Sequence, residues 1–215
     1  AEASLWAVIR ETARRNKVRD GIVYLQVSRG AAARDHAFPS PAVRPTLIVT
    51  AKNLDQGAIA RRAETGVKVI TLSETRWARR DIKSTNLLPN ALARQQAKEQ
   101  GAFEAWFVDA NGFITEGTSS NAWIVTTDGV IITTPLSNDL LHGVTRAALF
   151  RIAQAHQMRL QERLFTPDEA KTAREAFMSA ASNPAVPVIE IDGVTIGDGR
   201  PGPVSRALRA AYLGA

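Results

Sequence analysis

The chain has 215 residues, of which 45% are hydrophobic, and 27 Lys and Arg against 21 Asp and Glu give a net charge of +6. It is long enough to bury a core in one or two domains, and the absence of cysteine excludes disulfides and thiolate chemistry. We predict no metal site, because the three histidines are scattered along the sequence. We predict no membrane span, because no apolar run approaches the ~20 residues that a spanning helix needs, and we expect a cytoplasmic location. We predict no nucleic-acid partner, because the basic residues are dispersed rather than clustered.

The first part of the chain predicts a small α/β unit. Residues 3–15 have a helical pattern, and residues 22–28 alternate like a strand. A loop over 31–39 then leads to a second strand-like run at 44–50. The polar passage 53–57 follows and is typical of a linker between domains.

The remainder of the chain also alternates strand and helix. A strand is predicted at 67–72, a helix at 91–100, and a C-terminal helix at 203–212. Hairpin turns are predicted between strand-like runs at three dipeptides, Asn111-Gly112, Asp128-Gly129 and Asp192-Gly193. These patterns predict an α/β (α+β) protein with two domains, residues 1–57 and 58–215.

Lys83 is the candidate for covalent chemistry on a carbonyl group. It stands in an apolar, loop-like segment over residues 81–90, just before a helix. A lysine amine becomes a nucleophile near neutral pH when desolvation or a cationic neighbour lowers its pKa. Arg76, Arg79 and Arg80 lie just upstream and are the expected cationic neighbours. Taken alone, the segment is also compatible with a solvated surface lysine.

A second segment, Thr115-Glu116-Gly117-Thr118-Ser119-Ser120-Asn121, decides between these interpretations. Together with Asp81-Ile82-Lys83-Ser84, it resembles the fold-type IV pyridoxal-phosphate aminotransferases in motif order and separation. The resemblance implies that Lys83 holds pyridoxal 5'-phosphate as a Schiff base and later moves the substrate's α-proton. It also implies that Glu116 faces the pyridine nitrogen, where a carboxylate favours the protonated ring.

A third motif, Gly143-Val144-Thr145-Arg146, opens a helical run and matches the family's phosphate turn. Helix N-termini bind phosphate because their first amides lack intrahelical partners and the helix dipole favours an anion. The resemblance further implies that the cofactor is surrounded by Ser119, Ser120, Asn121, Leu141, Val144 and Thr145. Relatives often place a phosphate-binding threonine where this chain has Ala181, so we expect Ser182 or a backbone amide to take that role.

The substrate carboxylate is assigned to the loop at 31–39. Arg34 and His36 match the R-x-H carboxylate trap of D-amino acid aminotransferases, and the planar guanidinium suits a bidentate bond to a carboxylate. Tyr24 occupies a position that lines the pocket in relatives. We therefore expect amino transfer between a D-amino acid, such as D-alanine or D-glutamate, and a 2-oxo acid. The alternatives are a branched-chain L-amino acid aminotransferase, an aminodeoxychorismate lyase or a non-catalytic binding protein.

The resemblance also predicts the architecture. Residues 1–57 correspond to the remainder of a small α/β domain, and residues 58–215 to a larger, mixed pseudo-barrel domain that binds the cofactor. The family pattern begins ahead of Leu5, in a region that supplies a phosphate-binding arginine and a carboxylate-binding tyrosine. A homodimer is expected, with amino and 2-oxo acids as the small-molecule partners.

Overall fold

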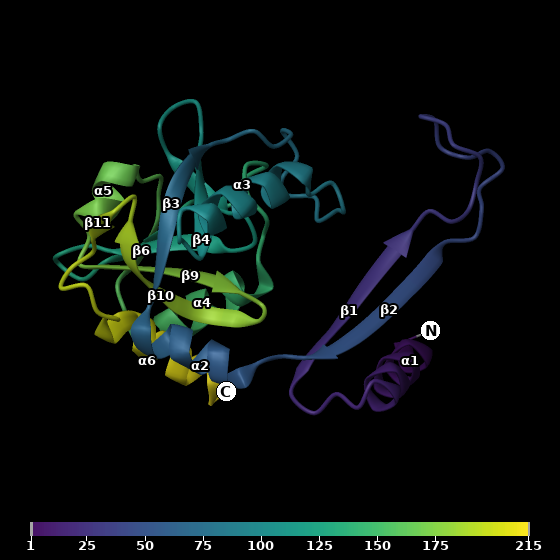
Figure 1. Ribbon diagram of the computed structural model, residues 1–215, viewed down its shortest axis with the longest axis horizontal. Coiled ribbons are helices and arrows are strands. Elements are labelled where there is room, and N and C mark those ends of the chain that lie inside the picture. Colours follow the sequence, from purple (N-terminus) through teal and green to yellow (C-terminus); the bar gives the residue numbers. More distant parts are fainter. Residues whose placement is uncertain (1, 215) are drawn as a thin grey trace. The chain divides into compact units, whose positions relative to one another are not determined.

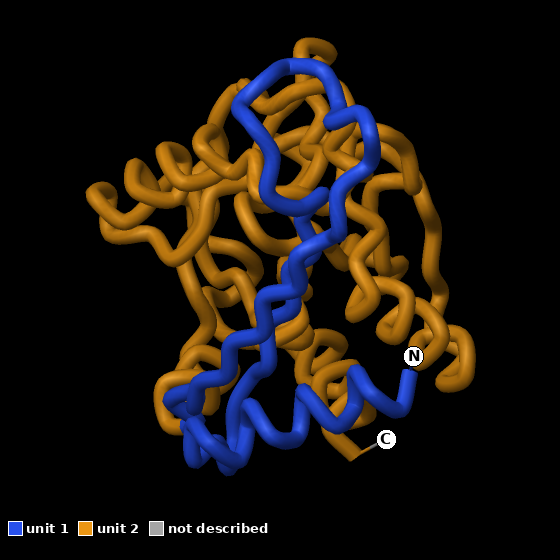
Figure 2. Tube along the Cα trace, turned by 90° about the vertical axis from the view of Figure 1, so that its right-hand side faces the viewer, with its two compact units in different colours: residues 1–56 blue, residues 57–215 orange. Residues whose placement is uncertain are grey.

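The computed structural model describes residues 2–214 and separates into two compact units, residues 1–56 and 57–215 (Figure 2). Unit 1 contains α1 (Glu2–Arg15), β1 (Gly21–Ser28) and β2 (Thr46–Asn53). The two strands pair antiparallel along their whole length, from Gly21 opposite Asn53 to Ser28 opposite Thr46. Residues 29–45 form the loop that connects them.

The elements predicted in unit 1 are present, with one shift. The second strand begins at Thr46 rather than 44 and continues to Asn53. Pro45 lies just ahead of it and has no amide hydrogen to donate to a strand ladder. The strand therefore starts after the proline.

Unit 2 is built on a nine-stranded mixed sheet with the order β5-β4-β3-β10-β9-β6-β7-β8, and β11 pairs with β10 (Figure 1). β3 runs parallel to β4 and to β10, and β7 runs parallel to β8. The strands are β3 (Val67–Ser73), β4 (Glu104–Val108), β5 (Ile114–Gly117), β6 (Asn121–Val125), β7 (Ile131–Thr133), β8 (Leu160–Glu162), β9 (Glu175–Ala180), β10 (Asn183–Ile191) and β11 (Val194–Thr195). The helices of this part are α2 (Gln56–Thr65), α3 (Leu88–Glu99), α4 (Val144–Ala155), α5 (Pro167–Lys171) and α6 (Pro203–Leu213).

The sheet curls back on itself. β5 and β6 are separated by only three residues, yet β5 is an edge strand and β6 is the sixth in the order. The amide of Ile114 on β5 donates to the carbonyl of Phe165, and the hydroxyl of Thr134 donates to the carbonyl of Ile114. These bonds join β5 to the segments beyond β7 and β8, so the mixed sheet forms a half-barrel.

Alternate residues of the strands point into separate cores, as the two-residue repeat of a strand requires. On β6, Ala122 and Ile124 belong to the cluster inside the curl, whereas Trp123 and Val125 pack with residues of α4 and α6. α3 covers a third cluster around Phe107. Helices α3, α4 and α6 thus cover the outer side of the curled sheet, whereas Ala170 of α5 packs into the cluster inside the curl.

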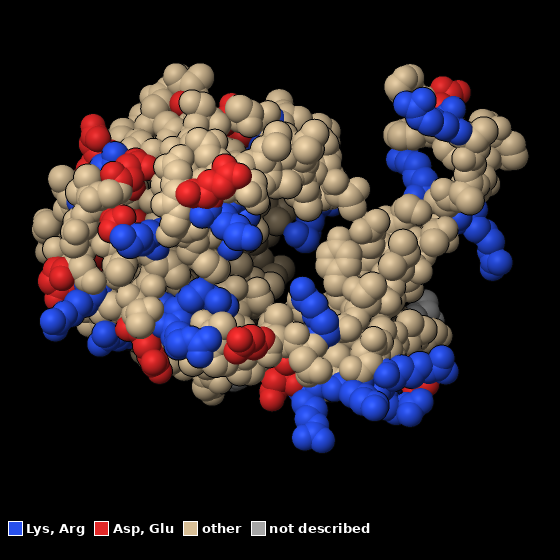
Figure 3. Space-filling view, viewed as in Figure 1, with Lys and Arg blue, Asp and Glu red and all other residues tan. Residues whose placement is uncertain are grey.

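Two helices were not predicted, α2 and α5. α2 begins at Gln56, inside the passage 53–57 interpreted as a linker, and Ile59 is its one buried residue, so its sequence pattern is weak. α5 is only five residues long, with the Thr166 hydroxyl accepting a bond from the amide of Glu169 at its start. Among residues 2–214, no helix is long and apolar enough to cross a membrane. Basic and acidic side chains are interspersed over the visible face of unit 2 (Figure 3).

Candidate active site

The site is built around the tight turn between β5 and β6. Residues 118–120 connect the two strands, and the amide of Gly117 donates to the carbonyl of Ser120 at 2.6 Å. Glu116, one residue before the end of β5, is buried, with 4% of its surface exposed. Asn121 begins β6 and is also buried.

The Glu116 carboxylate is bound on both of its oxygens. Oε1 accepts from Arg76 Nη1 at 2.6 Å, and Oε2 accepts from the amide of Leu141 at 3.0 Å and from Asn121 Nδ2 at 3.3 Å. Asn121 Nδ2 also donates to the carbonyl of Leu141 at 3.0 Å. The structure therefore brings together Glu116, Asn121 and Leu141, three residues that the sequence analysis assigned to one cofactor site.

Arg76 is the partner of Glu116 that the sequence analysis missed. Its side chain is 6% exposed, lies over the ring of Phe107 at 4.3 Å, and donates to both oxygens of Glu74 as well as to Glu116. Burial raises the pKa of the Glu116 carboxyl, and the charge of Arg76 opposes that rise. Burial acts in the same direction on Glu74, but the bonds from Arg76 hold its pKa below the usual range. One buried guanidinium is thus shared between two buried carboxyl groups.

The start of α4 has the properties of an anion site. Gly143 caps the helix in an extended conformation without a side-chain bond, so the first-turn amides have no capping side chain. Thr145 is buried, and its hydroxyl has no hydrogen-bond partner within residues 2–214. A Cβ on Gly143 would lie 2.2 Å from Asn121 Oδ1, so this turn packs directly against β6. Val144, by contrast, is 79% exposed.

Lys83 lies in the loop between β3 and α3, and its side chain is exposed. The adjacent Ile82 and the apolar residues Leu87 and Leu88 are exposed as well. The desolvated setting that the sequence analysis expected is therefore not found around Lys83 in this chain.

The arginines expected to act on Lys83 each engage carboxylates instead. Arg79 forms a bidentate pair with Asp81, and Arg80 binds Asp139. Arg76, as described above, is committed to Glu74 and Glu116.

The serines of the candidate site make protein contacts of their own. Ser119 is exposed and Ser120 is buried, and both hydroxyls donate to Glu104 Oε2, at 3.1 and 3.2 Å. Ser182 lies in the β9–β10 turn, where its hydroxyl accepts from Asn183 Nδ2 at 3.1 Å. Glu104 was not among the residues that the sequence analysis selected.

The three predicted substrate-binding residues all belong to unit 1. Tyr24 is on β1, is 47% exposed, and donates its hydroxyl to Gln26 Oε1. Arg34 and His36 are exposed in the loop between β1 and β2. The intervening Asp35 accepts from the amide of His36 at 2.6 Å. Arg34 and His36 therefore share one loop, with both side chains open to solvent.

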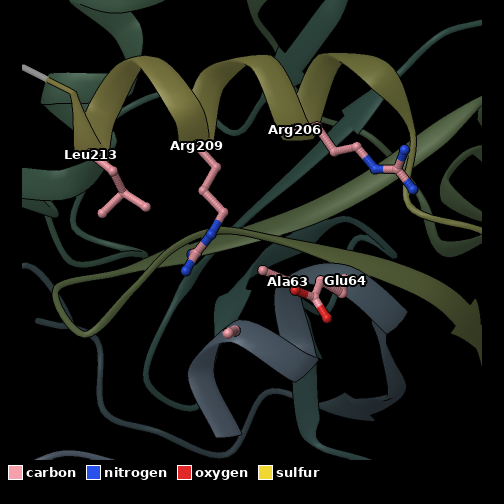
Figure 4. Close-up of a pocket in the computed structure, with 6 residues that line it drawn as sticks. Ala63, Glu64, Arg206, Arg209 and Leu213 are labelled. Carbon is pink, nitrogen blue, oxygen red and sulfur yellow. The ribbon is translucent and has the colours of Figure 1, made fainter. Parts of the chain in front are cut away.

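A groove of about 420 Å³ lies elsewhere in unit 2, between α2 and α6 (Figure 4). Arg209 extends from α6 toward α2 and donates to the carbonyl of Pro184 at 2.8 Å. Burial, together with the charge of Arg62, lowers the pKa of Arg209. The groove contains none of the predicted site residues. Within residues 2–214, no group of three or more His, Cys, Asp or Glu is arranged to hold a metal ion.

Comparison with known proteins gives a consistent result. The model of the family described as amino-transferase class IV matches residues 1–191. A D-alanine aminotransferase of Staphylococcus aureus is 40% identical over 198 residues, which cover 92% of this chain and 68% of that protein.

Solved structures of branched-chain amino acid aminotransferases are also similar. The Escherichia coli enzyme has a TM-score of 0.89 at 26% identity and covers all of this chain, which in turn covers 71% of that structure. The T.th. enzyme, described with pyridoxamine 5'-phosphate, has a TM-score of 0.87 at 32% identity, covering 99% of this chain and 70% of that one. The fold predicted from the sequence, a mixed pseudo-barrel, is confirmed by these structures.

Proposed function

The chain belongs to the class IV aminotransferases, and we propose that it uses pyridoxal 5'-phosphate to transfer an amino group between a D-amino acid and a 2-oxo acid. One observation carries the proposal. A buried carboxylate, Glu116, is held by Asn121 and the amide of Leu141, and Asn121 packs in turn against the turn that opens α4. The carboxylate that can pair with a ring nitrogen, Glu116, and the anion site at the start of α4 thus lie in neighbouring segments.

The residues present fit this cofactor. The buried Thr145 hydroxyl without a partner and the uncapped first turn of α4 offer donors to a phosphate. Glu116 offers a carboxyl group to the pyridine nitrogen; burial raises its pKa, and the charge of Arg76 opposes that rise. When bound, the cofactor supplies an electron sink for the negative charge that develops at the substrate's α-carbon.

Lys83 is the residue proposed to hold the cofactor covalently. Its primary amine, Nζ, is also the group proposed to accept and return the proton at the substrate's α-carbon. Its exposure in a loop leaves the amine accessible to a carbonyl compound. Ser119, Ser120, Asn121 and Ser182 are proposed to complete the surroundings of the cofactor.

The substrate proposal combines the relatives with the loop of unit 1. The D-alanine aminotransferase is 40% identical to this chain, against 26% and 32% for the two branched-chain enzymes. Arg34 and His36 supply a bidentate guanidinium and a further donor suited to an α-carboxylate. D-Alanine or D-glutamate is thus the proposed amino donor, and pyruvate or 2-oxoglutarate the acceptor. Branched-chain L-amino acids are the second candidate, supported by the structural similarity to those enzymes.

Three further assignments follow. Residues 1–57 are proposed to be part of a small substrate-binding domain and residues 58–215 the cofactor domain. A homodimer is proposed, because large apolar side chains are exposed along residues 77–92, namely Trp77, Ile82, Leu87, Leu88 and Leu92. A cytoplasmic location is proposed from the nature of the substrates, which are small metabolites.

Amino transfer from D-alanine to 2-oxoglutarate, followed as pyruvate formation, tests the proposal. The wild-type chain is expected to form pyruvate with D-alanine and not with L-alanine. Lys83→Ala is expected to abolish turnover while leaving the melting temperature near that of wild type, because Lys83 is exposed. Appreciable turnover in this variant would contradict the role given to Lys83.

A further inference from the structure

Glu104 is a completely buried carboxylate at the start of β4, with 0% of its surface exposed. It accepts hydrogen bonds from each of the three residues of the β5–β6 turn. The amide of Thr118 donates to Oε1 at 3.2 Å, and the Thr118 hydroxyl donates to the same oxygen. The hydroxyls of Ser119 and Ser120 donate to Oε2. The carboxylate thus binds the whole turn between Glu116 and Asn121 from its inner side.

The packing beside the turn leaves no room for a side chain at Gly117. A Cβ on Gly117 would lie 2.4 Å from Ser120 Oγ and 3.2 Å from Glu104 Cγ. The turn residue ahead of Thr118 is therefore a glycine because Glu104 and Ser120 fill the space beside it. Both groups are buried, so neither moves away without opening the core.

Glu104 also connects the turn to α3, the helix that follows the Lys83 loop. Arg94 on α3 pairs with Glu104 Oε2 at 3.0 Å, and Asn90, one helical turn earlier, donates to the carbonyl of Thr118 at 2.8 Å. Positions i and i+4 lie on one face of a helix. One face of α3 therefore binds both the turn and the carboxylate that holds it.

We propose that Glu104 is a positioning residue that fixes the turn at 118–120. The turn lies between two segments assigned to the cofactor. One is the Lys83 loop with α3, and the other contains Glu116 and Asn121. The assignment of the turn to the cofactor rests on the proposed function. The negative charge of Glu104 is important for holding the turn, because hydrogen bonds to a carboxylate are roughly twice as strong as bonds to a neutral amide oxygen. A glutamine has one acceptor oxygen, whereas Glu104 uses both oxygens for the turn.

Glu175 offers a matched control. It is buried, its carboxylate accepts from the amides of Val204 and Ser205 and from the Ser205 hydroxyl, and a partly exposed arginine, Arg174, lies 3.7 Å away. A glycine, Gly202, packs against it as Gly117 packs against Glu104. Glu175 holds the start of α6, which carries none of the residues assigned to the cofactor.

The experiment compares Glu104→Gln and Glu175→Gln with wild type by two measurements. Hydrogen–deuterium exchange of the peptide covering 117–121, without added cofactor, reports on the turn itself. Equilibrium binding of pyridoxal 5'-phosphate reports on the site. Glu104→Gln is expected to accelerate exchange of the turn about tenfold and to weaken cofactor binding about tenfold, as the loss of charged hydrogen bonds predicts. Glu175→Gln is expected to change neither, although thermal unfolding should show that the melting temperatures of both variants fall by similar amounts.

The outcomes separate the positioning role from the proposed function. Wild-type exchange in Glu104→Gln, or equal loss of cofactor affinity in both variants, would overturn the positioning role. Failure of wild type to bind the cofactor would overturn the proposed function, while the exchange measurement would still decide whether Glu104 holds the turn. If Glu104→Gln does not fold, Thr118→Val removes one hydroxyl donor and is expected to raise exchange of the turn several-fold; unchanged exchange there would refute the proposal.

Discussion

Replacing Arg76 with methionine is expected to destabilise the protein strongly at neutral pH. The side chains of Arg76, Glu74 and Glu116 are 6%, 7% and 6% exposed, so the substitution leaves two buried carboxyl groups without their shared cation. Removing one partner of a buried ion pair costs about 3–5 kcal/mol. A protein of this size loses roughly 2–4 °C in melting temperature per kcal/mol, so we expect a fall of about 6–20 °C.

The pH dependence distinguishes this electrostatic cause from a loss of packing. In wild type, Arg76 lowers the pKa of Glu74, so the stability gained from this ionised group is present above the ordinary glutamate pKa and is lost as pH falls. In the variant, Glu74 keeps only Arg80 as a cationic partner within residues 2–214, with the Arg80 Nε 3.7 Å from its Oε2, and Glu116 loses the charge of Arg76. Burial then raises the pKa of both groups relative to wild type, and the unfavourable ionised forms are relieved as pH falls. The difference in melting temperature between the two proteins should therefore be largest near pH 7.5 and shrink toward pH 4.5.

Thermal unfolding followed by circular dichroism between pH 4.5 and 7.5 measures both effects. Arg79→Met is the control, because the pair between Arg79 and Asp81 is exposed and its loss should leave the melting temperature nearly unchanged. Two results would refute the reasoning. One is a melting temperature of Arg76→Met at pH 7.5 that is less than about 2 °C below that of wild type. The other is a difference in melting temperature between the two proteins that does not change with pH.

Two further variants test the binding residues. Thr145→Val should keep or slightly raise the melting temperature, because the buried hydroxyl has no partner, while weakening pyridoxal 5'-phosphate binding about fivefold to tenfold in a fluorescence titration; unchanged affinity would remove Thr145 from the phosphate site. Arg34→Gln should raise the KM for D-alanine at least about tenfold, because the variant loses a charged hydrogen bond to the substrate. It should not lower the melting temperature, because Arg34 is exposed. Steady-state kinetics showing an unchanged KM would instead favour a substrate held elsewhere.

The sequence predicts the parts of the site that are continuous along the chain. Glu116 and Asn121 are five residues apart in one motif, and the structure joins them through one hydrogen bond. The start of α4 at Val144, next to Thr145, is also a local pattern, of a glycine followed by helix-forming residues. Such features depend mainly on neighbours in the sequence and are therefore visible without the fold.

The charged partners of the site could not be predicted in this way. Arg76 contacts Glu116 across 40 residues, and Glu104 contacts Ser120 across 16, so both partnerships exist only after β3, β4 and β5 have paired in the sheet. Arg76 was instead interpreted as a neighbour of Lys83. A usable signal was present, since Glu104 opens a strand whose other four residues are apolar. A carboxylate placed there must find several donors when it is buried.

The absorption spectrum of the protein with pyridoxal 5'-phosphate, recorded before and after addition of D-alanine and separately of L-leucine, tests the central claim most directly. We predict that D-alanine converts the lysine-bound cofactor band to that of the amine form, and that L-leucine leaves it unchanged. Conversion by L-leucine alone would contradict the assignment to D-amino acids and place the chain with the branched-chain enzymes. A wild-type protein that gives no lysine-bound band would contradict the use of the cofactor altogether.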